Sequence, residues 1–193
     1  MCLAPALALA KPVTDLGVSR DCAVRSANSA LLGARTCEKS EEQCKAERFN
    51  ESLQNLTCQA ESGDGEAAYM LGKMYFNGIH VAVDQNLAIH FWRKSAKSGH
   101  PAAQHDFAIL LLTDGFPTIE RTDEALYWLG TSASSGHALS AIVLGRLYEI
   151  GWYNIAPDLC MALTWYEAGE MMGLTAPNDY LDDTRQSSLA NCI

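Results

Sequence analysis

The sequence predicts an all-α fold built from stacked helix pairs, and three observations support that prediction. First, glycines recur at intervals of 36, 37 and 37 residues, at Gly63, Gly99, Gly136 and Gly173. Second, the apolar residues between them recur with the spacing of a helix face rather than with the alternation of a strand. Third, a small residue returns at a fixed distance after the first three of these glycines, as Gly72, Ala108 and Gly145. A fixed period of this length is typical of stacked repeats, in which each unit buries its apolar face against its neighbours.

Each repeat is predicted to be a pair of helices. In the first repeat, apolar residues recur at helical spacing over 68–75 and again over 87–96, and the turn sequence Asn77-Gly78 separates them. Three aspartates are expected to cap the second helices or to lie in their first turns: Asp84, Asp123 and Asp158. A glycine inside a helix costs about 1 kcal/mol relative to alanine. We therefore expect the recurring small residues to lie where two helices cross closely.

The first repeat carries a family resemblance. Residues 68–78 read Ala-Tyr-Met-Leu-Gly-Lys-Met-Tyr-Phe-Asn-Gly, and Ala88, Phe91-Trp92 and Ala96 follow. This pattern resembles the Sel1-like repeat, an αα-hairpin relative of the tetratricopeptide repeat. The third repeat matches it well, whereas the second departs from it with Phe107-Ala108 in place of Leu-Gly and with Leu111 in place of tyrosine.

The resemblance implies a right-handed αα-hairpin solenoid of about three Sel1-like repeats, whose first helices line a concave surface. It also implies a non-enzymatic adaptor or scaffold for other proteins, often in a bacterial envelope. We expect the chain to divide into a signal-peptide remnant at 1–10, an N-terminal extension at 11–36, a divergent capping hairpin at 37–62, repeats at 63–98, 99–135 and 136–173, and a C-terminal cap at 174–193.

The N-terminal ten residues predict export. They are apolar and uncharged, and they end in Ala8-Leu9-Ala10, which is similar to the cleavage site of a secretory signal. Ten residues are too few to span a membrane. The basic region that normally begins a signal peptide is missing, which leaves two alternatives open. Either the true start of the chain lies upstream, or the segment is merely an apolar leader. The predicted location is periplasmic or secreted.

Cysteine usage favours the same compartment. Removal of Cys2 leaves an even number, four before the repeats and two towards the C-terminal end of the chain: Cys22, Cys37, Cys44, Cys58, Cys160 and Cys192. We expect three disulfides that staple the terminal caps, the alternative being six free thiols in a cytosolic protein. Cys37 and Cys44 would stand about 10.5 Å apart on one helix, too far for a disulfide. Among fifteen possible pairings we favour Cys44–Cys58 across an antiparallel helix pair, Cys22–Cys37 and Cys160–Cys192.

Composition and motifs predict no catalytic residue, cofactor or metal site. The net charge of −9 argues against nucleic acid and anionic membranes as partners. The sequence contains no Cys-x-x-Cys, His-Glu-x-x-His, Gly-x-Ser-x-Gly or Ser-x-x-Lys. The segment 63–68 matches the letters of a dinucleotide-binding pattern but not its structural context, because the residues before it are predicted to form a helix rather than a strand. His100 and His137 take the same position in successive repeats, which separates them rather than gathering them around one ion.

A protein-binding surface is expected on the first helix of each repeat, on the side turned away from the packing residues. We name these residues the first-helix stripe: Met70, Lys73 and Asn77; Asp106, Ile109 and Thr113; Val143, Arg146 and Glu149. Their mixed charge suits an extended peptide or a helix of another envelope protein. Two further functions are open. The segment 13–17 resembles MotX-type flagellar stator proteins, and cysteine-rich Sel1 relatives suggest an enzyme acting on cell-wall or β-lactam substrates.

Overall fold

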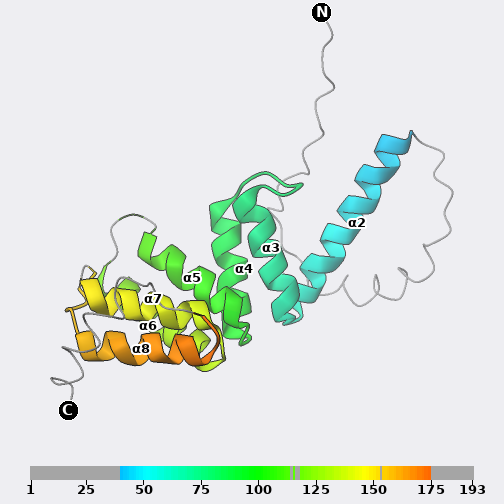
Figure 1. The fold of residues 1–193 in the computed structure, drawn as a ribbon. Coiled ribbons are helices and arrows are strands. Elements are labelled where there is room, and N and C mark those ends of the chain that lie inside the picture. The colour runs from blue at the N-terminus through cyan, green and yellow to red at the C-terminus, as the bar shows by residue number, and fades with distance from the viewer. Residues whose placement is uncertain (1–39, 114, 116–117, 153, 175–193) are drawn as a thin grey trace, which may run out of the picture. The chain divides into compact units, whose positions relative to one another are not determined.

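The computed structural model describes residues 40–113, 115, 118–152 and 154–174 (Figure 1). Within this part, the chain forms helices and one isolated β-bridge between Trp152 and Ile155. The helices are α2 (Glu41–Glu61), α3 (Gly65–Asn77), α4 (Gln85–Lys97), α5 (Pro101–Thr113), α6 (Ile119–Ser134), α7 (Ala138–Ile150) and α8 (Leu159–Met171). The predicted all-α class is confirmed.

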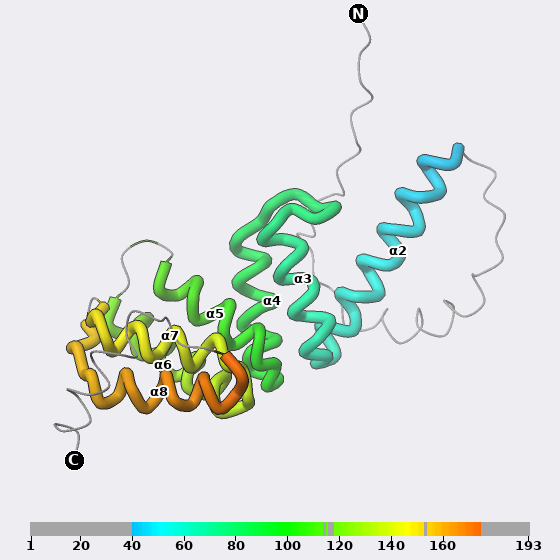
Figure 2. Tube along the Cα trace, in the orientation of Figure 1, coloured from blue at the N-terminus to red at the C-terminus, as the bar shows by residue number. Residues whose placement is uncertain are grey.

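The chain divides into two compact units, with the boundary between Ser98 and Gly99. In the first unit, α3 and α4 lie side by side and α2 packs against α3 (Figure 2). In the second unit, α5 pairs with α6, α7 pairs with α8, and α6 packs against α7. Each predicted repeat is therefore one helix hairpin.

The expected caps are confirmed at two of the three aspartates. The carboxylates of Asp84 and Asp158 accept hydrogen bonds from backbone N–H groups in the first turns of α4 and α8. Such bonds satisfy amides that the helix itself leaves unpaired. The expectation for Asp123 is wrong, because α6 begins a turn earlier at Ile119 and the Thr118 hydroxyl caps it instead.

The repeat glycines are required by the backbone. Gly63, Gly99, Gly136 and Gly173 have φ values of 103°, 91°, 89° and 91°. A Cβ atom at any of the four would meet nothing within 4 Å, so space is not what excludes a side chain. Positive φ is the conformation that residues with a Cβ rarely adopt. Each of these glycines follows the second helix of a hairpin or α2, and it turns the chain into the segment that comes next.

The small residues inside the first helices are required by space. A Cβ on Gly72 would stand within 2.9 Å of three Trp92 ring atoms, and one on Gly145 within 3.0 Å of three Tyr166 ring atoms. The prediction of close helix crossings is thus confirmed for α3 with α4 and for α7 with α8. In the second repeat the equivalent positions hold Ala108 and Leu129, both fully buried. A larger residue on the first helix accompanies a smaller one on the second, which accounts for Ala108 in place of glycine.

A hydroxyl also joins the helices of the first two hairpins. The Ser95 hydroxyl donates to the carbonyl of Gly65 (2.6 Å), and the Ser132 hydroxyl donates to the carbonyl of Pro101 (2.7 Å). Both serines are fully buried and take the same position in their repeats. In the third repeat, Gly169 takes this position and packs against Ile142 instead.

The prediction of a capping hairpin at 37–62 is wrong. Ser40 caps a single continuous helix of 21 residues, α2, so no turn interrupts residues 41–61. The favoured Cys44–Cys58 bridge is wrong for the same reason. These residues lie on one helix, 14 residues and about 21 Å apart, and a disulfide needs Cα atoms within about 7 Å.

Several predicted features lie outside the described residues: the signal-peptide remnant, the N-terminal extension, the greater part of the C-terminal cap, Cys22, Cys37 and Cys192. The described cysteines are Cys44, Cys58 and Cys160, and each is disulfide-bonded. Among the described helices, none has both the length and the apolar character needed to cross a bilayer.

Candidate functional site

The first-helix stripe is open to solvent on α3. Met70, Lys73 and Asn77 are all exposed, and Met70 retains 46% of its accessible surface. Leu71, in contrast, is completely buried. The Lys73 ammonium lies 5.4 Å from the centre of the Tyr69 ring, a distance at which a cation and an aromatic face attract. On α3 the structure therefore presents an apolar side chain and a positive charge one turn apart.

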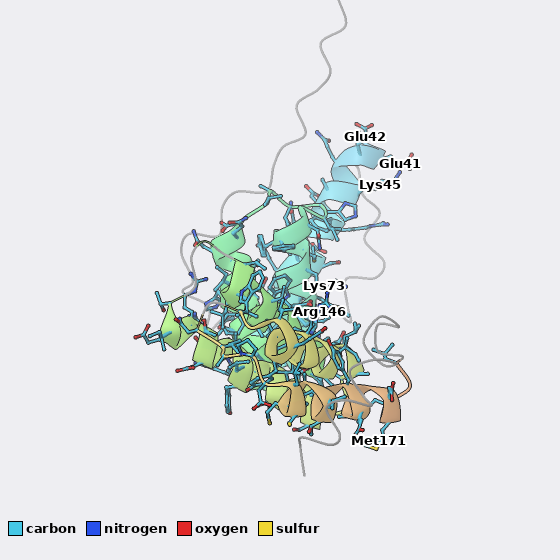
Figure 3. All side chains as sticks on the ribbon, turned by 60° about the vertical axis from the view of Figure 1, so that its left-hand side comes forward. Glu41, Glu42, Lys45, Lys73, Arg146 and Met171 are labelled. Atoms are coloured by element: carbon cyan, nitrogen blue, oxygen red, sulfur yellow. The ribbon has the colours of Figure 1, made fainter. Side chains whose placement is uncertain are left out.

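In the second unit the stripe is less accessible. On α5, Asp106 and Ile109 are half-buried, while Thr113 is exposed and its hydroxyl donates to the carbonyl of Ile109 (2.9 Å). On α7, Val143 is half-buried and the Arg146 side chain is 55% exposed. Figure 3 labels Lys73 on α3 and Arg146 on α7, the two cations of the stripe. The helical spacing predicted which side of each helix faces out, but not how deeply neighbouring side chains cover it.

Glu149 belongs to an interaction inside the α7–α8 hairpin. Its Oε2 accepts a hydrogen bond from the Tyr166 hydroxyl (2.7 Å) and an ion-paired one from Arg146 Nη1 (3.0 Å). Burial raises the pKa of Tyr166 well above its ordinary value, and the hydrogen bond to Glu149 raises it further. The Glu149 carboxylate is therefore bound by its own hairpin, and Arg146 holds it from the solvent side.

A second polar cluster, which the sequence reasoning missed, lies in the second unit. We name it the His–Ser cluster: His105 on α5, Ser132 on α6, and His137 and Ser140 at the start of α7. The Ser140 Oγ lies 2.9 Å from His105 Nδ1, 3.0 Å from His137 Nδ1 and 2.8 Å from Ser132 Oγ. The two imidazole centres are 4.9 Å apart.

The hydrogen bonds of this cluster run in one direction. A carbonyl can only accept, so the Ser132 hydroxyl donates its one hydrogen to the Pro101 carbonyl and accepts a hydrogen bond from the Ser140 hydroxyl. Because the Ser140 hydrogen is then already donated, His105 and His137 must each donate to the Ser140 oxygen from Nδ1. A serine nucleophile needs a histidine that accepts its proton. The cluster has the opposite polarity, and its geometry is that of a structural network.

The pKa values of both imidazoles of the cluster are lowered. Burial lowers the pKa of His105, and the neighbouring His137 lowers it further, while Asp106 opposes the shift. Burial likewise lowers the pKa of His137, against the effect of Asp106. The preceding repeat uses the equivalent His100 as a cap, since its Nδ1 accepts the backbone N–H of Ala103 (3.1 Å). In the described part of the chain, no three acidic, histidine or cysteine side chains gather as metal ligands.

Exposed apolar side chains also gather where α3 leads into α4. Phe76, Ile79 and Val83 are exposed by 40%, 46% and 62%. The Phe76 ring lies against Trp92, with centroids 4.9 Å apart. Sequence reasoning treated this stretch only as a turn, although its three large apolar residues within eight positions were a visible signal.

Proteins to which the chain is similar include one curated protein and two solved structures. The chain is 31% identical over 88 residues to chitin synthase regulatory factor 4 of Schizosaccharomyces pombe, covering 45% of this chain and 13% of that protein. A Sel1 repeat protein from Oxalobacter formigenes is 27% identical, with a TM-score of 0.55 over 72% of this chain and 98% of that one. A protective antigen of uropathogenic Escherichia coli with an SLR fold is 27% identical, with a TM-score of 0.57 over 64% of this chain and 26% of that one.

The chain therefore spans about an eighth of the length of its yeast relative and about a quarter of the Escherichia coli antigen. The family model of the Sel1 repeat matches three consecutive segments of the chain, 65–100, 101–137 and 138–174. Together they cover more than half of the sequence, and each contains one of the helix hairpins α3–α4, α5–α6 and α7–α8. On these grounds, the chain belongs to the Sel1 repeat family.

Proposed function

We propose that this chain is a non-enzymatic scaffold that holds a protein or peptide of the bacterial envelope along its first helices. Sel1 repeat proteins are in general protein-interaction scaffolds, and the fold is typically non-catalytic. The yeast relative is named as a regulatory factor of a synthase, which fits a protein that acts by binding. The similarity to a protective antigen supports a location outside the cytoplasm.

The observation that carries the proposal is the open stripe on α3. Met70, Lys73 and Asn77 are exposed in a row, on the helix whose opposite side is fully packed. An exposed methionine adapts to differently shaped apolar partners, and a lysine beside it sets charge complementarity and registration. This combination suits a partner that offers an apolar side chain next to an acidic one. Because the packing side is already filled, binding there needs no rearrangement of the core.

Charge reversal at Lys73 tests the proposal. The Lys73→Glu variant is expected to bind a partner captured from an envelope extract at least tenfold more weakly, because the reversed charge repels an acidic group. Its thermal midpoint should stay within error of the parent, since exposed charges usually change stability by less than about 0.5 kcal/mol.

The matched control is Lys97→Glu on α4, at another exposed lysine. Lys94, although also on α4, is unsuitable because its ammonium forms an ion pair with Glu61 and its side chain is only 28% exposed. Affinity that survives Lys73→Glu but is lost in Lys97→Glu would place the partner on the second helices and refute the proposed surface.

A further inference from the structure

Three large apolar side chains are exposed together at the turn between α3 and α4, and we name them the turn patch: Phe76, Ile79 and Val83. Phe76 lies in the last turn of α3, and its ring lies against Trp92 of α4, with centroids 4.9 Å apart. Val83 packs over Gly78, the residue before Ile79, because a Cβ there would stand 2.8 Å from Val83 Cγ2. Single exposed apolar residues are ordinary on a protein surface, whereas a group of them marks an interaction site.

Backbone hydrogen bonds hold this turn in one conformation. The Ile79 N–H donates to the carbonyl of Met74, and the Asp84 N–H donates to the carbonyl of Tyr75 (both 3.0 Å). Val81, in the middle of the turn, is buried. A molecule that contacts the turn patch therefore meets a surface that is already ordered, and little conformational entropy is lost on binding.

The turn also contains an unfavourable backbone conformation. His80 has φ of 59°, and in the described part of the chain it is the non-glycine residue with positive φ. Residues with a Cβ rarely adopt this conformation, which persists only where the surrounding structure fixes it. Here the His80 ring lies against Phe49 of α2, with centroids 5.4 Å apart. Backbone strain that is kept beside exposed apolar side chains is expected of a binding surface rather than of a simple connection.

The fold itself does not require an apolar residue at position 76. The turn of the third repeat is held in the same way: the Asp158 N–H donates to the carbonyl of Tyr148 (2.7 Å), and Ile155 is buried within the turn. Glu149 there takes the position that Phe76 has in the first repeat, directly after the tyrosine. Because the same kind of turn forms with a carboxylate at this position, closure of the hairpin does not explain the Phe76 ring.

The charge beside the turn patch is positive. Lys73 is exposed on α3, three residues before Phe76, which makes the two side chains neighbours on the helix surface. The Asp84 carboxylate accepts a hydrogen bond from the Leu87 N–H (3.0 Å), so its charge is directed at the first turn of α4. Glu66 precedes Phe76 by ten residues, about 15 Å along the helix axis. An acidic group is therefore the complement of the border that Lys73 forms.

We propose that the turn patch and Lys73 together bind a protein segment in which a large apolar side chain stands within four residues of an aspartate or glutamate. The apolar side chain packs on the turn patch, and the carboxylate pairs with Lys73. Side chains up to four residues apart on a helix, or two apart on a strand, face the same side, so either conformation of the segment satisfies this spacing. The inference rests on the proposed function, because it names the class of partner for the same first helix.

Selection from a peptide library on the intact chain tests this class of partner. A phage-displayed library of random dodecapeptides is selected on the immobilised protein, and the enriched peptides are synthesised and titrated by fluorescence polarisation. Enriched peptides are expected to carry an acidic residue within four positions of Leu, Ile, Met, Phe or Trp, and their affinity should fall as salt rises. Enrichment of peptides that lack an acidic residue, or no enrichment over the bare support, would overturn the proposal.

Two variants remove the turn patch without changing charge. Phe76→Ser and the double variant Ile79→Thr/Val83→Thr should each bind the selected peptides about tenfold more weakly or worse, because a large apolar contact is lost. Threonine keeps the branched shape of the side chains in the turn, so the double variant decides the matter if Phe76→Ser does not fold.

Tyr127→Ser is the matched control for Phe76→Ser. Tyr127 is an exposed aromatic residue on α6, and its ring lies against Trp128 with centroids 5.0 Å apart, as Phe76 lies against Trp92. This variant should bind the peptides as the parent does. An equal loss of affinity in Tyr127→Ser would show that the peptides do not recognise the turn patch, and would overturn the proposal.

Lys73→Glu separates this inference from the proposed function. Peptide binding that is lost in Lys73→Glu but intact in both patch variants would overturn the turn patch and leave the first-helix stripe standing. Peptide binding that is lost in the patch variants but intact in Lys73→Glu would overturn the acidic partner. An envelope partner that binds Lys73→Glu normally, while the selected peptides do not, would refute the proposed function alone.

Phosphatidylcholine vesicles exclude a different role for the same side chains. The chain is expected to stay in the supernatant when these vesicles are sedimented. Sedimentation of the parent but not of the two patch variants, together with no enriched peptide, would assign the turn patch to a membrane surface and overturn the proposal.

Discussion

Replacement of Gly72 by alanine measures how tightly α3 and α4 cross. The added Cβ would lie 2.2 Å from Cδ1 and 2.4 Å from Nε1 of Trp92, well inside contact distance. Helix propensity gains about 1 kcal/mol from this change, while overpacking of a filled core typically costs 1 to 3 kcal/mol. The ring cannot easily withdraw, because Trp92 is buried and also lies against Phe76. We therefore expect Gly72→Ala to destabilise the first unit by roughly 1 kcal/mol.

The second repeat supplies the compensating change. Its equivalent pair is Ala108 with Leu129, so Gly72→Ala should become neutral or stabilising once Trp92→Leu has removed the ring. The coupling in this double-mutant cycle should be about 1 to 3 kcal/mol, whereas independent sites add to within about 0.5 kcal/mol. Urea unfolding followed by circular dichroism gives the four free energies of unfolding.

Gly130 is the matched control. It lies inside α6, and a Cβ there would meet nothing within 4 Å. Gly130→Ala should therefore gain the full propensity term of about 1 kcal/mol, which corresponds to a rise in Tm of about 2–4 °C for a chain of this size. If Gly72→Ala raises Tm as Gly130→Ala does, or if the cycle is additive, then the crossing is not tight and our reasoning is refuted.

Three further predictions concern the second unit. Because the pKa values of His105 and His137 are lowered below 6.5 in the folded state, the unfolded chain takes up protons first as pH falls through 6.5. The Tm should thus be constant above pH 7.5 and fall from about pH 7 to 5. This fall should be less steep in His105→Gln than in the parent, and an equal slope of Tm against pH in both would exclude the cluster as the cause. Ser132→Ala should destabilise the folded chain by about 1 to 3 kcal/mol, and by more than Ser95→Ala, because it deprives both Pro101 and Ser140 of a hydrogen-bond partner. Chemical denaturation ranks the two variants, and the reverse order would contradict the proposed network. Finally, Arg146→Glu should lower Tm, unlike Lys73→Glu, because it places a second negative charge beside Glu149. Glu149→Leu should lower Tm further, because it removes the hydrogen-bond acceptor of the Tyr166 hydroxyl. Unchanged midpoints in both variants would show that this contact contributes nothing to stability.

Local patterns in the sequence were enough to predict the repeats. Helix pairs, their period and the close crossings at Gly72 and Gly145 all follow from spacing along the chain, because each hairpin is a short-range unit whose two helices are about twenty residues apart. The same spacing predicted that Met70, Lys73 and Asn77 share an open side of α3. Family membership followed from the same residues.

Tertiary structure decided what spacing along the chain does not contain. Packing decides at which residue each helix begins, to within one turn. That start determines whether Asp123 or Thr118 caps α6, and whether residues 41–61 form one helix or two. Glu149 was predicted as an open charge, yet the position of Tyr166 on the next helix makes it a half-buried hydrogen-bond acceptor. The His–Ser cluster arises only when α5, α6 and α7 converge. Periodicity determines the side of a helix that a residue occupies; the neighbour it meets there is determined by contacts between distant segments, and those depend on shape and burial rather than on the repeat.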